Sequence, residues 1–517
     1  MFNFLKKRAS TYFTNVIGIC VILYSLFLSS SAVRYGDLGF NTDLARDFLL
    51  LENIQETHKL TLLGPRSGGI PGLFHGPLWM YINLPAYFLG HGNPVAVGWF
   101  WVGLIAVLIG ITYWVGKSLI NHTVGLLAAL LVGLNTVPMA PQLFNPFGAV
   151  IFSPLFFYFF YKYFTEAKAR YLLIALLING VIIQFQVAFG GPMLFLATII
   201  VVYRCFKKKQ LKHLYTYFIL LIPLSTYIFF DLRHNFLELH SIIIYLQGKS
   251  GKVNDFYFND FIYNRFSGMI NSLIPIASPS IYIIILILGL FGYLIYYSLK
   301  NKKEKYSQFI LLFFYFFFGY WLITLFFRGV IWSYYYWPFI PIELLIVTIS
   351  IKKINKFLYT GIILVTFILT LQTAQASANV YTPATVGKDG SSWLFNYNLA
   401  QTVFDQGDKA FGYYIFSPDQ YGYSPRYAMN YVAKMHPTIT VYPYQKETTT
   451  YLIISPPGGK DNSIGGDWWK LHRVNIKQQP NKIITFTNGF RIEKYIFSAK
   501  EKAIPSDPNL IDNLIFR

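Results

Sequence analysis

Repeated apolar segments of about 20 residues constrain this chain more than any other feature, because about 20 apolar residues cross the hydrocarbon core of a bilayer. Hydrophobic residues make up 54% of the 517 residues and charged residues only 13%, against about 25% charged residues in a typical soluble domain. Eleven segments have this character: 12–33, 95–115, 122–139, 146–163, 171–188, 190–206, 214–231, 279–298, 309–327, 333–350 and 358–376. The sequence therefore predicts a mainly α-helical polytopic membrane protein with about eleven transmembrane helices.

Basic residues between these segments predict the orientation of the chain, because Lys and Arg in short loops are retained on the cytoplasmic side. With the N-terminus inside, the inner segments hold 19 of the 43 basic residues and only 2 of the 23 acidic ones. We therefore expect a multi-pass protein of the cytoplasmic membrane with an uncleaved first helix, a cytoplasmic N-terminus and an extracytoplasmic C-terminus. The net charge of +20 then reflects topology and contact with membrane lipids, and no nucleic-acid partner is predicted.

Three polar regions fall on the predicted outer face: the loops 34–94 and 232–278, and the tail 377–517. The tail alternates helical and strand-like patterns, which favours a soluble α/β domain. The expected helices are 392–406 and 425–435, and the expected strands are 410–416, 450–456, 482–488 and 490–497. The segment "PPGGK" at 456–460 lacks the spacing of a phosphate-binding loop and is predicted to be a turn.

The first half of loop 34–94 contains "FNTDLARDFLLL" at 40–51. Asn41 or Thr42 is a suitable N-cap, and Leu44, Phe48 and Leu51 recur at helical spacing, so we expect a helix over 43–57 on the membrane surface. Asp43, Arg46 and Asp47 would share the neighbouring face of this helix, where the positive end of the helix dipole favours an ionised Asp43. Ordinary capping and solvated ion pairs explain the same residues without any catalytic role.

The second half of the loop has a glycine-rich turn, "GPRSGG", followed by "FHGPLWMYINLPAYFL". Pro77 is a favoured first-turn residue, and the apolar helix that it begins is too short to span a bilayer. We expect this helix to lie in the membrane interface, so that two interfacial helices flank the turn.

These residues resemble a known family. "NTDLARD" followed by "FHGPLWMYI" is similar to the first-loop pattern of membrane glycosyltransferases of the GT-C fold, particularly the relatives of protein O-mannosyltransferases and lipid A aminoarabinose transferases. The resemblance implies a GT-C-like catalytic domain over residues 1–376 and a polyprenyl-phosphate sugar donor. It also implies a glycan, lipid or protein acceptor whose hydroxyl displaces the lipid phosphate, normally with inversion.

The resemblance also assigns roles to residues. Asp43 takes the place of the catalytic aspartate, which would accept the proton of the acceptor hydroxyl. Arg46 matches the arginine of the same motif, and His75 with Pro77 matches its H-x-P pair. Leu44 replaces the usual glutamate, which puts in doubt a mechanism that needs two adjacent carboxylates, although Asp47 lies one turn further on.

Cationic residues would stabilise the departing phosphate. Arg233, in the weaker match "FDLRHNF" at 230–236, is the leading candidate, with support from His234, Arg66 and Arg328. Arg233 is equally expected as an interfacial anchor.

A divalent metal bound by Asp43, Asp47, His75 and His234 would have suitable ligand types, but no recurrent spacing supports it, and no metal ligands are assigned.

Other functions remain open: a transporter or flippase for lipid-linked glycans, an oligosaccharide ligase or polymerase, and a non-catalytic scaffold. Transporters commonly show internal repeats and intramembrane ionisable groups. This sequence shows no repeat, and Glu343 is the one charged residue deep in a predicted span. The aromatic residues Trp332 to Trp337 are expected as an interfacial belt rather than as a sugar-binding surface.

Overall fold

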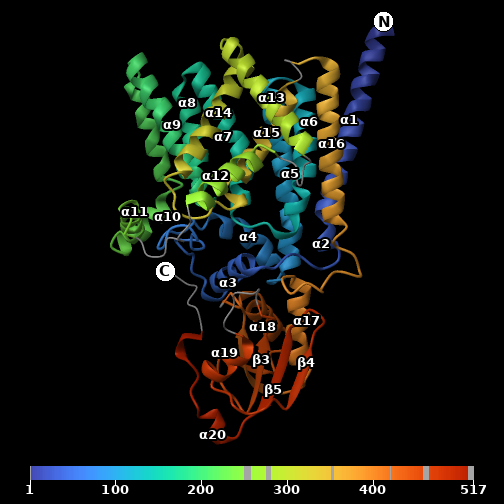
Figure 1. The fold of residues 1–517 in the computed structure, drawn as a ribbon, viewed down its shortest axis with the longest axis vertical. Helices are drawn as coiled ribbons and strands as arrows, with labels where there is room; N and C mark the ends of the chain where they lie inside the picture. Colours follow the sequence, from blue (N-terminus) through green and yellow to red (C-terminus); the bar gives the residue numbers. More distant parts are fainter. Residues whose placement is uncertain are drawn as a thin grey trace.

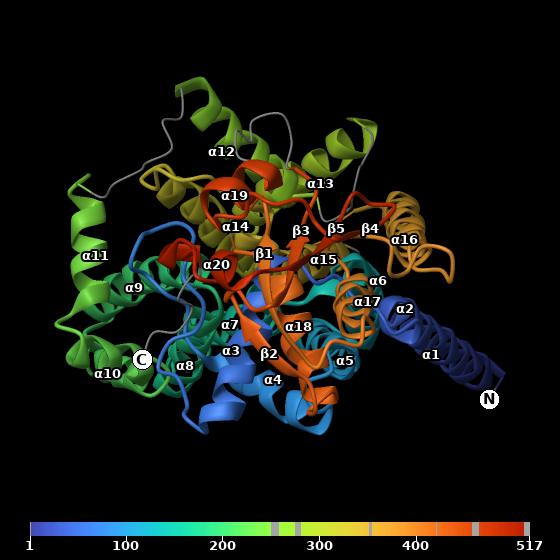
Figure 2. The same cartoon turned by 90° about the horizontal axis from the view of Figure 1, so that it is seen from below.

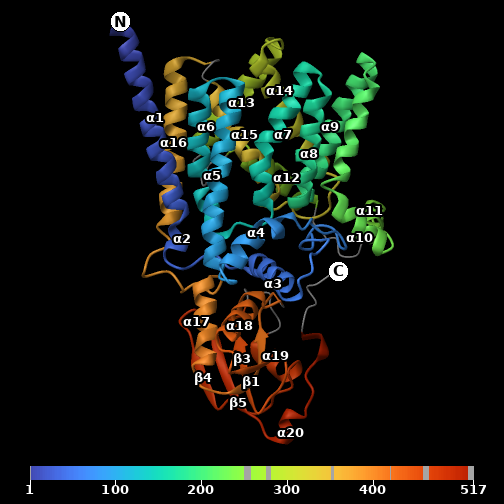
Figure 3. The same ribbon diagram turned by 180° about the vertical axis from the view of Figure 1, so that it is seen from behind.

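The computed structural model describes residues 2–249, 258–274, 281–350, 354–419, 421–457 and 465–510. A bundle of long helices stands above a small sheet region, and two short helices of the first loop lie between them (Figures 1 and 3). The N-terminal end of the first helix lies at the end of the bundle that is remote from the sheet (Figure 1). The arrangement confirms a mainly helical membrane protein with a small C-terminal α/β part.

The bundle is built from α1 (Phe2–Ser29), α5 (Pro94–Leu119), α6 (His122–Asn135), α7 (Pro146–Glu166), α8 (Ala169–Phe185), α9 (Val187–Lys208), η2 (Leu211–Leu221), α10 (Ser225–Arg233), α13 (Ile281–Lys300), α14 (Lys305–Thr324), α15 (Ile340–Ile349) and α16 (Lys356–Ala378). Each of the eleven predicted segments overlaps one or two of these helices, and residues 279 and 280 lie outside the described residues. Within the described residues, six helices are long and apolar enough to cross a membrane, and the bent pair η2 and α10 makes a seventh if it is one span. The other predicted segments form shorter apolar helices, so the total of eleven spans stays a prediction.

Aromatic side chains fill the centre of the bundle, because α7 and α14 carry long runs of phenylalanine. Phe339, in the one-turn helix η4 (Trp337–Phe339), is fully buried and contacts the rings of Phe157, Phe189 and Phe317 at centroid distances of 4.9 to 6.4 Å. Edge-to-face ring pairs of this kind add packing energy beyond burial alone. Glu343 is also fully buried here, and neither of its carboxylate oxygens has a hydrogen-bond partner among the described residues.

Short helices gather at the end of the bundle that faces the sheet. They are α2 (Ser31–Arg34), α3 (Thr42–Thr57), α4 (Leu78–Leu89), η1 (Val137–Gln142), α11 (Leu237–Leu246), α12 (Phe258–Ser272) and η3 (Ser333–Tyr335). The predicted helices over 43–57 and from Pro77 are confirmed as α3 and α4. Asn83 of α4 accepts a hydrogen bond from the Trp101 indole of α5 at 2.7 Å, which fixes α4 against the bundle.

The sheet contains β1 (Ala410–Phe416), β2 (Thr440–Pro443), β3 (Thr449–Ile454), β4 (Lys482–Thr485) and β5 (Arg491–Ile496), in the order β2-β1-β3-β5-β4. Strand β1 is parallel to β2 (Ala410 opposite Thr440) and to β3 (Gly412 opposite Thr450), whereas β5 is antiparallel to β3 and β4. The associated helices are α17 (Trp393–Phe404), α18 (Tyr423–Met435), α19 (Gly466–His472), α20 (Ala499–Lys502) and η6 (Pro508–Leu510).

The predicted α/β pattern of the tail is confirmed, with each predicted element within three residues of an observed one. Strand β2, with four residues, and helix α19, with seven, were not predicted. Most of the predicted turn "PPGGK" lies outside the described residues.

Helix α18 packs against α3 and joins the sheet region to the first loop (Figure 2). The Tyr427 hydroxyl lies 2.5 Å from the Gly92 carbonyl oxygen and 3.2 Å from the Tyr87 hydroxyl. Lys434 of α18 forms an ion pair of 2.6 Å with the buried Glu52 of α3. These contacts place the sheet region directly beneath the helix that carries Asp43.

Candidate functional site

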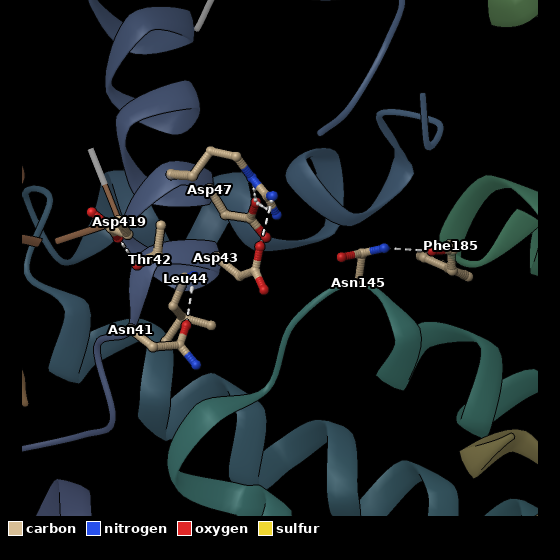
Figure 4. Close-up of polar contacts among 9 residues, drawn as sticks. Asn41, Thr42, Asp43, Leu44, Asp47, Asn145, Phe185 and Asp419 are labelled. Atoms are coloured by element: carbon tan, nitrogen blue, oxygen red, sulfur yellow. Dashed lines mark hydrogen bonds and ion pairs between the residues drawn. The ribbon is translucent and has the colours of Figure 1, made fainter. Parts of the chain in front are cut away.

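The N-terminus of α3 carries the polar side chains predicted from the first loop (Figure 4). Asn41 has extended backbone geometry, and its side chain accepts a hydrogen bond from the Leu44 amide at 3.1 Å. Asn41 is therefore the N-cap, one of the two residues expected for this role. Leu44, Phe48 and Leu51 are buried as the apolar strip, which leaves Asp43, Arg46 and Asp47 on the adjacent face.

Arg46 bridges the two aspartates of α3. Its Nη1 donates to Asp43 Oδ1 at 2.8 Å, and its Nη2 donates to Asp47 Oδ1 at 3.0 Å. The Asp43 side chain is 48% exposed, whereas the Arg46 and Asp47 side chains are 16% and 4% exposed. The ion pair with Asp47 is therefore a buried one, and the interpretation of both pairs as solvated surface contacts is wrong for Asp47.

Burial changes the protonation of this trio. Burial raises the pKa of Asp47 to about 6, although the neighbouring Arg46 charge opposes the shift. Burial alone would lower the pKa of Arg46, but the two carboxylates outweigh it and raise that pKa. The guanidinium therefore keeps its positive charge beside Asp43, which is the more exposed of the two acids.

The glycine-rich turn folds back on itself as a narrow hairpin. The Gly64 amide donates to the His75 carbonyl at 2.8 Å, and the His75 amide donates to the Pro65 carbonyl at 2.9 Å. Gly72 turns the chain with a φ of +82°, a conformation that costs little only for glycine. The Phe74 amide donates to the Glu238 carboxylate of α11 at 3.0 Å, so a helix of the loop 232–278 holds one arm of this hairpin.

His75 lies inside this arrangement as a neutral side chain. Its ring is buried, and Nδ1 has no hydrogen-bond partner among the described residues. Burial, together with the positive charge of Arg46, lowers the pKa of His75 to about 3. A neutral imidazole can hydrogen-bond a ligand but carries no proton for acid catalysis near neutral pH.

Asp43, Arg46 and His75 meet in one cavity of about 350 Å³. Its other polar and aromatic lining residues are Thr42, Asn53, Lys59, Thr61, Arg66, Ser67, Phe74, Phe144, Asn145, Tyr334, Tyr335, Tyr421 and Tyr423. Figure 4 shows the Asp43 and Asn145 side chains on facing sides of the space between α3 and the start of α7. Three cations, Arg46, Lys59 and Arg66, and one carboxylate, Asp43, line this cavity, so it favours an anionic ligand.

The structure does not bring every predicted residue to this cavity. Arg233, at the end of α10, is exposed, and His234 stacks on Phe230 with ring centroids 4.0 Å apart. Arg328 is also exposed, and none of the three lines the cavity. Asp47 is held behind Arg46 rather than on the cavity wall.

Sequence reasoning missed several lining residues. Lys59 lies two residues after the end of α3 and belongs to no motif. Its position in a polar loop close to the Asp43 helix is a signal that could have marked it as a phosphate ligand. Tyr334 and Tyr335 belong to the segment predicted as an interfacial belt. Asn145 donates to the Phe185 carbonyl at 2.7 Å, which fixes its side chain at the cavity wall.

The candidate metal ligands are not assembled into a metal site. Among the described residues, no three His, Cys, Asp or Glu side chains are grouped to hold a metal ion. The Arg46 guanidinium already forms ion pairs with both Asp43 and Asp47, and its charge disfavours a second cation beside His75. These donors therefore do not fit a resident divalent metal.

Solved structures show the fold to which the chain is similar. ArnT from Cupriavidus metallidurans in the apo state matches with a TM-score of 0.59 and 10% sequence identity, over 94% of this chain and 98% of that chain. ArnT bound to undecaprenyl phosphate matches with a TM-score of 0.53 and 11% identity, over 96% and 99% of the two chains. No family model and no curated protein sequence matches this chain.

The match to ArnT extends from the first helix through the sheet region, because it covers nearly all of both chains. The resemblance stated from two short motifs of the first loop is thereby confirmed at the level of the fold. This membrane protein has the GT-C fold seen in the lipid A aminoarabinose transferase ArnT.

Proposed function

We propose that this protein is a glycosyltransferase that moves a sugar from a polyprenyl-phosphate donor to an acceptor hydroxyl. One observation carries the proposal: the half-exposed carboxylate of Asp43 lines a cavity that also contains Arg46, Lys59 and Arg66. A carboxylate that accepts a proton and cations that bind a leaving phosphate are the two groups that this reaction needs. The bound lipid of the similar ArnT structure is undecaprenyl phosphate, which supports a donor of this class.

In the proposed reaction, the acceptor hydroxyl oxygen attacks the anomeric carbon of the donor sugar. The bond between that carbon and the phosphate oxygen breaks, and the lipid phosphate leaves with the bonding electron pair. Asp43 accepts the hydroxyl proton, while Lys59 and Arg66 stabilise the phosphate charge. Attack opposite the leaving group inverts the configuration at the anomeric carbon.

Arg46 and Asp47 are positioning residues in this proposal, because they orient the Asp43 carboxylate. Arg46 holds the Asp43 carboxylate at 2.8 Å and is itself held by the buried Asp47. His75 lines the cavity as a neutral ring, and its buried Nδ1 has no hydrogen-bond partner among the described residues. The catalytic membrane domain would extend over 1–376 and the soluble domain over 377–517. Both this cavity and the sheet would face the extracytoplasmic side, as the basic inner loops predict.

The test of this function is the release of free polyprenyl phosphate. Purified protein would be incubated with a panel of polyprenyl-phosphate sugars and a crude cell-envelope acceptor fraction, and the lipid products would be separated by chromatography. We expect release from at least one donor, coupled to labelling of the acceptor. A transporter or flippase would instead move the intact lipid-linked sugar across vesicles without breaking its bond, and that result would contradict the proposal.

Neutralising Lys59 or Arg66 is expected to weaken binding of the donor and to leave binding of the acceptor unchanged. A hydrogen bond to a charged group contributes about 1.5–3 kcal/mol, so Arg66→Gln should raise the donor KM by about tenfold or more. Lys59→Gln should act in the same direction. Arg233→Gln is the matched control, since Arg233 is exposed outside the cavity. A donor KM that rises only in Arg233→Gln would move the phosphate site to α10.

Removal of divalent metal is expected to leave turnover unchanged, because Arg46 supplies the positive charge between Asp43 and Asp47. The initial rate of lipid-phosphate release would be compared in buffer with excess chelator and in buffer with added Mn²⁺ or Mg²⁺. A rate that disappears with chelator and returns with one metal would contradict the Arg46-centred site.

A further inference from the structure

The sheet region has a strand order that creates a crevice at one of its ends. Strand β1 has β2 on one side and β3 on the other, and all three are parallel. The chain passes from β1 to β2 and then crosses back over β1 to reach β3. The strands that follow β1 and β3 in the chain therefore lie on opposite sides of this pair. In open α/β sheets, ligands bind outside the carboxyl ends of the strands at such a switch in direction.

A cavity of about 540 Å³ lies at this point. Ser417 follows β1 and Ser455 follows β3, and both line the cavity together with Asn488 from the turn between β4 and β5. The rings of Tyr423 and Phe490 form part of its wall. Hydroxyl and amide groups beside aromatic rings suit a ligand with many hydroxyls and apolar C–H faces, as carbohydrates have.

Charged groups of the crevice favour the same class of ligand. Among the described residues, Asp389 and Asp419 line it together with one cation, Lys388. Asp389 Oδ1 accepts from the Ser391 amide and hydroxyl, both at 2.8 Å, which fixes the orientation of the carboxylate. Carboxylates accept hydrogen bonds from sugar hydroxyls but repel phosphate. The crevice is thus unsuited to the anionic donor that the cationic cavity would bind.

The crevice adjoins the Asp43 cavity. Thr42 and Tyr423 line both cavities, and the Thr42 hydroxyl donates to Asp419 at 2.5 Å across the boundary (Figure 4). Asp43 is the next residue along α3. A ligand that extends from the crevice past Thr42 would therefore bring its end to the carboxylate of Asp43.

We propose that this crevice is the acceptor subsite and that the acceptor is a carbohydrate with a neutral, hydroxyl-rich end. The inference rests on the proposed function, in that Asp43 receives the proton of the acceptor. It adds that the sheet region binds the acceptor, whereas the first loop binds the donor phosphate. Acceptor specificity then depends on the lining residues that directly follow β1 and β3, Ser417 and Ser455, rather than on the membrane helices.

The test places a tryptophan in the crevice at the carboxyl end of β1. The same substitution at the amino end of β1, outside the crevice, is the control. Ser417→Trp places a large ring at the carboxyl end of β1, where Ser417 is half-buried. Lys409→Trp places the same ring on an exposed position just before the amino end of β1. Asp389→Asn, which keeps an oxygen to accept from Ser391, is a second crevice variant that introduces no bulk.

Two measurements would be made on the full-length protein in detergent. The first is enzymatic. The acceptor KM is measured in the transfer reaction, and the rate of donor hydrolysis by water is measured without acceptor. We expect Ser417→Trp to raise the acceptor KM at least tenfold and Asp389→Asn to raise it severalfold. Donor hydrolysis should change less than twofold in both, and Lys409→Trp should match the native protein. An acceptor KM that changes equally in Ser417→Trp and Lys409→Trp, or in neither, would overturn the subsite.

The second measurement is direct binding of maltotriose, mannotriose and N-acetylchitotriose by saturation-transfer NMR, which requires no transfer reaction. Binding to the native protein that Ser417→Trp abolishes and Lys409→Trp retains would support the subsite, even if no donor is cleaved and the proposed function fails. Binding that persists in Ser417→Trp, or the absence of binding to all three sugars, would overturn it as a carbohydrate site.

Discussion

Asp43→Asn is expected to lower sugar transfer by about 10²–10⁴-fold, the usual contribution of a positioned general base. The amide has nearly the same shape as the carboxylate and can still accept the hydrogen bond from Arg46, but it cannot take the proton of the acceptor hydroxyl. The Asp43 side chain is 48% exposed and lines the cavity, so the substitution removes little buried interaction. The loss should appear in kcat, with the donor KM nearly unchanged.

The matched control for Asp43→Asn is Glu56→Gln, which removes one charge from the same helix. Glu56 lies at the other end of α3 and pairs with Lys434 at 2.9 Å, outside the cavity. Thermal denaturation in detergent would verify that both variants are folded. Full transfer by a folded Asp43→Asn protein would remove Asp43 from the role of base. Equal losses in both variants would indicate a general effect on α3.

Local sequence patterns predicted helices and caps well in this protein. The Asn41 cap and the apolar strip of α3 depend on residues within one or two helical turns, so a single sequence contains their signal. The same holds for β1, whose seven residues match the predicted segment at both ends. Strand β2 escaped prediction because its four residues end in Pro443, and a proline within a run weakens the signal for a strand.

The composition of the site could be predicted only in part, because its parts are distant in the chain. Asp43, Arg46 and His75 come from one loop, and their motif brought them together. Asn145 comes from the start of α7, and the Thr42–Asp419 hydrogen bond joins residues that are 377 positions apart. Such contacts depend on how helices and sheet pack. Arg233 and His234 show the opposite error: their local motif predicted a place in the site, but both residues lie outside the cavity.

Arg46→Gln is expected to destabilise the folded protein strongly, because it leaves Asp47 buried without its cation. Removing one partner of a buried ion pair costs about 3–5 kcal/mol, and Asp47 is only 4% exposed. Transfer should fall as well, since Asp43 loses the group that orients it. The measurement is the denaturation midpoint in detergent at several pH values, together with the transfer rate under conditions where the variant is folded.

The destabilisation by Arg46→Gln should depend on pH in a defined direction. Burial raises the pKa of Asp47 in the folded protein to about 6 from its ordinary value of 3.8. This pKa should rise further without the Arg46 charge that opposes the shift. The folded state therefore binds this proton more tightly than the unfolded state, and stability is lost as the pH rises through the folded-state pKa. We expect a larger defect at pH 8 than at pH 5.

The double variant Arg46→Gln/Asp47→Asn separates the buried charge from other effects of losing Arg46. Two neutral amides can hydrogen-bond to each other, so removing both charges should restore most of the stability at pH 8 and abolish the pH dependence. The transfer rate should stay low, because Asp43 still lacks its guanidinium partner. If the double variant is as unstable as Arg46→Gln at pH 8, the destabilisation comes from lost packing of the Arg46 side chain. A pH-independent defect in the single variant would lead to the same conclusion.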